Sequence, residues 1–156
     1  MNFLNEEFLK YQKKIGQKLG PTDWIQITQN KIDEFAQLTQ DSQFIHIDPI
    51  KAKQHSPFGK TIAHGFLVLS FASKFALDVF PEIKKNEIRI NYGFNKVRFL
   101  HPVEVDSNIR GNFILKNTEK KNELSLINTY ELSIEIQTKE KPAIVSEWII
   151  LNQYLK

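Results

Sequence analysis

The residues that could carry chemistry lie close together in this chain of 156 residues, between Asp41 and Ser73. Asp41 and His46 are five positions apart, in a stretch that lacks regular periodicity and that we expect to be a non-helical loop between two helices. A turn in this loop can bring the carboxylate and the imidazole to one point, where they could hold a water and take its proton. The alternative is an ordinary structural pair, with Asp41 capping a helix and His46 packed on the core.

A second candidate is the sequence Ala63-His64-Gly65, which directly precedes a long apolar run. Backbone N–H groups at the start of a helix have no partner within the helix and lie at the positive end of its dipole. A glycine there lets a ligand oxygen approach closely, so the N–H of Gly65 could form an oxyanion hole. The alternative is that Gly65 only permits a tight turn.

Three further side chains could belong to such a site. Phe58 lies in a Pro-Phe-Gly turn between the Asp/His segment and Gly65, where it could cover a pocket or simply pack. Ser70 and Ser73 interrupt the apolar run, and a buried hydroxyl needs a partner. We expect at least one of these two serines to hydrogen-bond back to a helix carbonyl.

Composition and missing motifs exclude several kinds of chemistry. The chain has no cysteine, which removes disulfides, zinc ribbons, iron–sulfur clusters and a cysteine nucleophile. The four histidines lack a metal-binding spacing, so we expect no metal. The chain also lacks the glycine-serine elbow of hydrolases, the phosphate loop and the dinucleotide fingerprint.

Charge and hydropathy exclude some classes of binding partner. The net charge is +3, but basic and acidic residues are interleaved, which argues against a nucleic-acid partner. The first residues do not resemble a secretory signal, and the apolar run is shorter than the ~20 residues that cross a bilayer. We therefore expect a cytoplasmic chain with no membrane partner.

The periodicity of apolar residues predicts one α+β domain over residues 1–156. We expect an amphipathic N-terminal helix over 1–20, a helix capped by Thr28 that ends near Asp41, and a short helix from Asp48-Pro49 to Lys53. A central apolar helix follows over 66–80. From residue 86 the period changes to two, which predicts four or five antiparallel strands that curl around this helix. The strands are expected around 88–92, 103–105, 109–115, 130–136 and 143–151, with the polar run 116–123 as a separator.

The whole segment from Asp41 to Ser70 resembles the hydratase motif of the MaoC-like dehydratase family, in its NodN-like branch. The resemblance rests on three strings: Asp-Ser-Gln-Phe-Ile-His at 41–46, Ser-Pro-Phe-Gly-Lys-Thr-Ile-Ala-His-Gly at 56–65, and Ile-Asn-Tyr-Gly-Phe-Asn-Lys-Val-Arg-Phe at 90–99 with Pro-Val at 102–103. It covers residues 24–115, and the later strands match in pattern only.

This resemblance implies a hot-dog fold, in which an antiparallel sheet wraps a central helix, and pairing into a homodimer. It implies (R)-specific hydration of trans-2-enoyl thioesters, or the reverse dehydration, on coenzyme A or an acyl carrier protein, with no separate cofactor. Asp41 and His46 would hold the catalytic water, and the Gly65 N–H would bind the thioester oxygen. Further residues expected at the substrate pocket are Gln43, Phe44, Phe58, His64 and Ser73.

The chain departs from the usual motif at Gln43-Phe44, where most hydratases of the family have Asn-Pro. The longer and bulkier side chains are expected to reshape the acyl tunnel. Two alternatives stay open: a hot-dog thioesterase, in which water attacks the carbonyl carbon, and a non-catalytic protein that binds acyl thioesters.

Overall fold

The computed structural model describes residues 3–155 of the chain. These residues form five helices and six strands. The helices are α1 (Phe3–Gln12), α2 (Gln29–Thr39), α3 (Phe44–Ile47), α4 (Pro49–His55) and α5 (Gly65–Val79). The strands are β1 (Lys18–Leu19), β2 (Ile25–Gln26), β3 (Glu87–Phe99), β4 (Asn108–Asn122), β5 (Ser125–Ile136) and β6 (Ile144–Tyr154).

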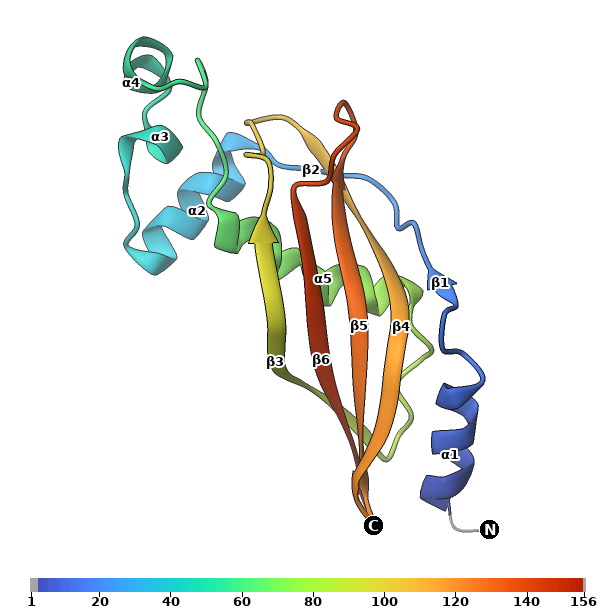
Figure 1. The fold of residues 1–156 in the computed structure, drawn as a ribbon. Coiled ribbons are helices and arrows are strands. Elements are labelled where there is room, and N and C mark those ends of the chain that lie inside the picture. Colours follow the sequence, from blue (N-terminus) through green and yellow to red (C-terminus); the bar gives the residue numbers. More distant parts are fainter. Residues whose placement is uncertain (1–2, 156) are drawn as a thin grey trace.

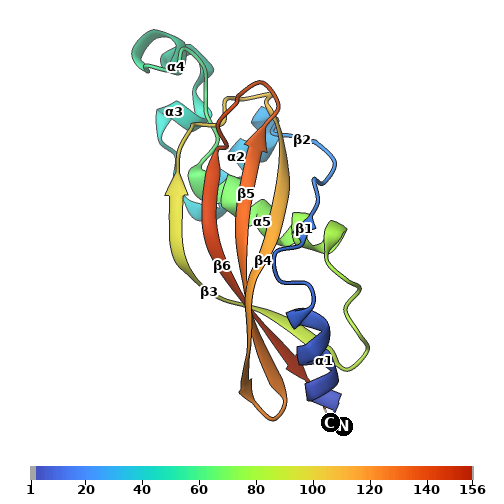
Figure 2. The same cartoon turned by 45° about the vertical axis from the view of Figure 1, so that its right-hand side comes forward.

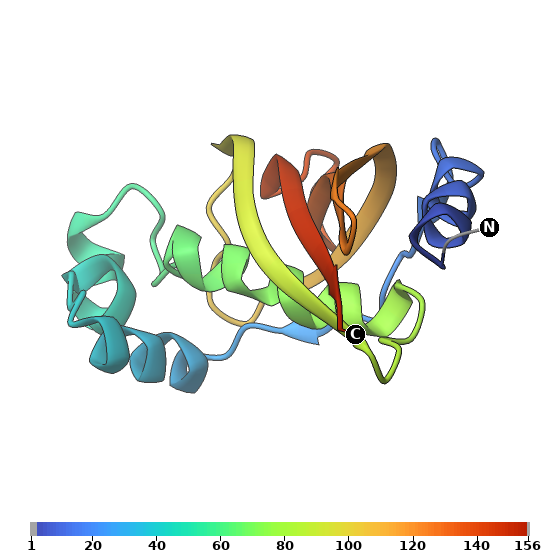
Figure 3. The same cartoon turned by 90° about the horizontal axis from the view of Figure 1, so that it is seen from below.

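The strands form one antiparallel sheet in the order β1-β4-β5-β6-β3, with β2 also paired to β4. Residues of β4 and β5 alternate between buried and more exposed, as expected for strands with one face on a core. The sheet curls over α5, which runs across its inner face (Figures 1 and 3). This α+β arrangement is the hot-dog architecture expected from the sequence.

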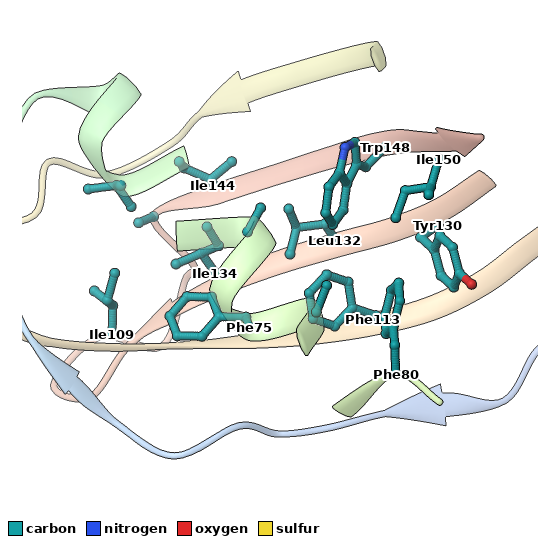
Figure 4. Packing of buried hydrophobic residues seen from close by; sticks show 14 of the residues in the cluster. Phe75, Phe80, Ile109, Phe113, Tyr130, Leu132, Ile134, Ile144, Trp148 and Ile150 are labelled. Atoms are coloured by element: carbon teal, nitrogen blue, oxygen red, sulfur yellow. The ribbon is translucent and has the colours of Figure 1, made fainter. Parts of the chain in front are cut away.

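The core lies between α5 and the sheet. Phe75, in the middle of α5, is fully buried, and Figure 4 shows its ring among side chains from β4, β5 and β6. A Cβ at Gly111 on β4 would lie 2.7 Å from the Cβ of Phe75, so only glycine lets helix and strand approach this closely. This close approach sets the distance between α5 and the sheet, and thereby the position of the start of the helix.

The N-terminal helix is shorter than expected. We predicted a helix over 1–20; residues 1–2 lie outside the described residues, and α1 ends at Gln12. Gly16 adopts a φ of +83° and donates its N–H to the carbonyl of Leu115, so the chain leaves the helix and joins the sheet as β1. The apolar spacing at Ile15 and Leu19 therefore reflects the approach to a sheet edge and not a helix face.

The strand boundaries differ from the expected ones. β3 and β5 are longer than the predicted strands at 88–92 and 130–136. Most of the polar run 116–123, predicted as a separator, is the far end of β4, which pairs with β5 as far as Asn122. Its side chains are polar because this end of the hairpin extends beyond the core. Residues 103–105 form no strand of the sheet, and the local pairing there is a single bridge between Ile62 and Glu104.

Three other expectations are confirmed. The side chain of Thr28 accepts from the N–H of Lys31 at the start of α2, and Asp48 caps α4 in the same way. The central helix has nearly the expected bounds. Among residues 3–155, no helix is long and apolar enough to cross a membrane.

We expect Phe75→Ala to lower the free energy of unfolding by about 3–5 kcal/mol, because it removes a fully buried ring between α5 and the sheet. Phe66→Ala on the same helix is the matched control, since Phe66 is 71% exposed, and should change it by less than about 1 kcal/mol. Denaturant unfolding measures both values. Equal losses in the two variants would contradict the packing described.

Candidate active site

The helices α2, α3 and α4 gather beyond the end of α5 at which Gly65 lies (Figures 1 and 2). Gln29, at the start of α2, forms hydrogen bonds to two other segments of this region. Its side-chain amide donates to the carbonyl of His46 at 2.7 Å, and its carbonyl oxygen accepts from the Thr61 hydroxyl at 2.5 Å. The helix that follows Asp41 and the segment that precedes α5 are thereby joined to one side chain.

His46 lies on α3, a single helical turn, and not in the non-helical loop that we expected. The turn begins as the backbone N–H groups of His46 and Ile47 bond to the carbonyl of Gln43. Four residues are too few to show helical periodicity in a sequence, which explains the wrong prediction. The turn directs the His46 side chain inward, where the residue is 7% exposed.

Asp41, His46 and His64 meet at one point. One ligand atom from each, a carboxylate oxygen or a ring nitrogen, lies within 4.8 Å of the other two. Asp41 follows Gln40, whose left-handed conformation ends α2, and its side chain is 53% exposed while both histidines are buried. Two hydrogen bonds of about 2.8 Å reach farther than this limit, so the Asp41 carboxylate and His46 are close enough to bind the same water. Asp41 caps neither neighbouring helix.

The tautomer of His46 follows from its hydrogen bond. Its Nδ1 lies 2.7 Å from the carbonyl oxygen of Ile62, and because a carbonyl can only accept, Nδ1 carries the proton. The other nitrogen, Nε2, is left with a free lone pair. Burial is the main cause that lowers the pKa of His46, opposed by the bond to Ile62 and helped by the nearby His64. The lowered pKa favours the neutral form of the His46 imidazole.

His64 lies directly against the imidazole ring of His46. Its ring stacks on the His46 ring with centroids 3.8 Å apart, and its Nε2 donates to the backbone carbonyl of Asp41 at 2.9 Å. The Asp41 carboxylate oxygen Oδ2 is 3.9 Å from the same nitrogen. The side chain predicted as a pocket residue thus contacts both Asp41 and His46.

A cavity of about 260 Å³ opens beside His46 and Gly65. The N–H of Gly65 belongs to the first turn of α5, where backbone donors have no partner within the helix. A Cβ at position 65 would lie 2.9 Å from the ring of Phe99, so a larger residue would displace this ring. The other residues that line the cavity are mostly apolar: Ile62, Ala63, Val68, Leu100, His101, Pro102, Val103, Ala143 and Ile144.

Asp41, His64 and the remaining residues predicted for the site lie outside the lining of this cavity. Gln43 is exposed at the start of α3, and Phe44 lies under the ammonium group of Lys51. Phe58 is 36% exposed on the loop after α4. Ser73 is eight residues beyond Gly65, about 12 Å along the helix, where it accepts a long hydrogen bond of 3.5 Å from Asn91.

Ser70 bonds back to the Leu67 carbonyl at 2.7 Å, as expected for one of the two serines. Sequence reasoning missed Gln29, the carbonyl of Ile62 and the ring of Phe99. A backbone carbonyl carries no sequence signal, and Gln29 looks like any polar residue in the first turn of a helix. Phe99 lay within the family-like string at 90–99 but had no role assigned to it.

The three side chains could also offer ligands to a metal ion. Each imidazole, however, already uses one nitrogen as a donor to a backbone carbonyl, so each has at most one lone pair left. The remaining nitrogen of His64, Nδ1, is buried without a hydrogen-bond partner. An imidazole that donates one N–H to a backbone carbonyl and keeps the other nitrogen unprotonated suits a proton acceptor and a metal ligand alike.

Several known proteins are similar to this chain in sequence and in fold. Residues 10–136 match the family model described as MaoC like domain. The chain is 43% identical over 141 residues to Nodulation protein N of Rhizobium leguminosarum bv. viciae, covering 90% of this chain and 88% of that protein. It is 39% identical over 135 residues to 3-hydroxyacyl-thioester dehydratase Z of Mycobacterium tuberculosis, covering 86% and 88%.

A solved (R)-hydratase from A. caviae involved in PHA biosynthesis has the same fold, with a TM-score of 0.70 and 23% identity over 91% of this chain and 96% of that one. The family match spans most of the chain, including the Asp41–Gly65 segment. The chain therefore belongs to the MaoC-like dehydratase family.

Proposed function

We propose that this protein catalyses the (R)-specific hydration of trans-2-enoyl thioesters, or the reverse dehydration of 3-hydroxyacyl thioesters. The observation that carries the proposal is the grouping of His46 with the Asp41 carboxylate, in which Nδ1 of His46 donates to Ile62 and His46 lines the same cavity as Gly65. The names of two similar proteins, a 3-hydroxyacyl-thioester dehydratase and an (R)-hydratase, support the same reaction class.

In this proposal, a water lies between Asp41 and His46. The Nε2 of His46 takes one proton from the water, and the oxygen forms a bond to C3 of the enoyl group. The C2=C3 electrons shift toward the carbonyl, so negative charge develops on the thioester oxygen. The Asp41–His46 pair then returns a proton to C2, which completes the addition of one water.

Gly65 would stabilise the developing charge. Its N–H lies at the positive end of the α5 dipole, and a donor at this position contributes on the order of 3 kcal/mol to transition-state stabilisation. The apolar walls of the cavity, among them Val68 and Ile144, would exclude bulk water and strengthen this interaction. Coenzyme A or an acyl carrier protein would supply the thiol.

We also propose that the protein forms a homodimer through the free edge of β3. Among residues 3–155, β3 is hydrogen-bonded on one side only, to β6. Along and just after this strand, Ile88, Ile90, Tyr92, Phe94, Phe99 and Leu100 are between 39% and 50% exposed. A long apolar edge strand favours pairing with another chain, and a second copy offers the same edge in antiparallel orientation.

Replacing either member of the pair tests the catalytic assignment. Asp41→Asn and His46→Gln should each lower the hydration rate of crotonyl-CoA by at least ~100-fold with little change in folding, because the general base is lost. Loss of enoyl absorbance measures hydration, and a thiol reagent measures hydrolysis. His55→Gln, at an exposed position at the end of α4, is the matched control. Near-full activity in both site variants would refute the assignment, and release of thiol by the wild type would favour a thioesterase.

The pH dependence of kcat/KM follows from the environment of His46. Because burial lowers its pKa, His46 stays neutral to a lower pH than a free histidine, whose pKa is about 6.5. Activity should fall on the acid side with an apparent pKa below this value. Steady-state kinetics from pH 4.5 to about 8 measure it. An acid limb centred above 6.5 would mean that His46 is charged near neutrality and cannot act as proposed.

The dimer proposal predicts that Ile88→Lys combined with Ile90→Lys gives a monomer, because two charges on the free edge oppose pairing. Light scattering after gel filtration measures the mass. Leu38→Lys, at an apolar position of α2 that is 82% exposed, is the control and should stay dimeric. A monomeric wild-type protein would contradict the proposal directly.

A further inference from the structure

His64 is the residue that starts α5, but its side chain does not serve the helix. It occupies the N-cap position, where a polar side chain usually accepts from the first N–H groups, and it makes no such bond. Instead the side chain is turned away from the helix and is 3% exposed. The buried His64 side chain does not cap the helix. Its contacts are with Asp41 and His46 instead.

The first contact holds the backbone at Asp41. This residue follows the left-handed Gln40 at the end of α2, and its own side chain is half exposed. The hydrogen bond from His64 Nε2 to the Asp41 carbonyl, 2.9 Å long, ties this surface turn to the buried residue before α5. Because Nε2 is the donor, this bond also fixes which nitrogen of His64 carries the proton.

The second contact holds the ring of His46. The His64 ring has His46 as a stacked neighbour at 3.8 Å and Phe35 of α2 as a tilted neighbour at 5.1 Å. The His46 ring is thereby fixed from two directions, in its plane by the bond from Nδ1 to Ile62 and on its face by His64. Both constraints are needed if Nε2 is to face the water held by Asp41.

We infer that His64 is a positioning residue that holds Asp41 and His46 in one arrangement, through a hydrogen bond to the first and ring stacking on the second. The inference rests on the proposed hydration and assigns a role that the catalytic pair does not include. A displacement of about 1 Å at a reacting group can cost ~100-fold in rate, so a residue that does no chemistry can still control kcat.

Two variants separate the contacts. His64→Phe keeps a ring that can stack and removes the donor, whereas His64→Gln keeps an amide N–H within reach of the Asp41 carbonyl. We expect His64→Phe to lower kcat by at least ~10-fold with KM within ~3-fold of wild type, because orientation and not binding is lost. His64→Gln loses the stacked ring, so its kcat should also fall at least ~5-fold below that of the wild type. His55→Phe, the same substitution at an exposed histidine, is the control.

A wild-type kcat in His64→Phe or in His64→Gln would overturn the inference. Nitrogen-15 NMR of the wild-type protein provides a test that needs no variant to fold. It should show the proton on Nε2 of His64 and on Nδ1 of His46, and the opposite tautomer at His64 would overturn the inference whatever the activity. Failure of wild-type protein to hydrate any enoyl thioester would instead refute the proposed function.

Discussion

The buried hydrogen bond from Nδ1 of His46 to the carbonyl of Ile62 joins two segments that are 16 residues apart in the chain. One segment carries the base on α3, and the other leads through Ala63 and His64 into α5. The same bond fixes the tautomer of His46 and leaves Nε2 available. A single contact thus sets both where the imidazole lies and which nitrogen can accept a proton, and the other parts of the site are arranged around it.

The sheet and the central helix determine where this site can form. Phe75 fills the space under α5, and Gly111 lets the helix come close to β4. Ala63, two residues before α5, donates to the carbonyl of Val103 in the segment between β3 and β4. Gly65 in the first turn of α5 therefore lines the cavity from a rigid element.

The sequence predicted which residues form the candidate site better than it predicted how they are arranged. Asp41, His46 and Gly65 stood out because their residue types and the following apolar run are local features, and the Thr28 cap and the bounds of α5 followed from local rules as well. The contact of Gln29 with His46 and the stacking of His64 depend on tertiary packing, which no local pattern contains. The helix expected over 1–20 was wrong beyond Gln12 because two apolar residues fitted both a helix face and a sheet edge.

We propose that water adds to C3 of an enoyl thioester under control of Asp41 and His46. The most direct test is the hydration of crotonyl-CoA by the wild-type protein in deuterium oxide, with the product analysed by NMR and by chiral separation. We expect (R)-3-hydroxybutyryl-CoA with one deuterium at C2. Free coenzyme A with unhydrated crotonate, or a product of the opposite configuration at C3, would contradict it.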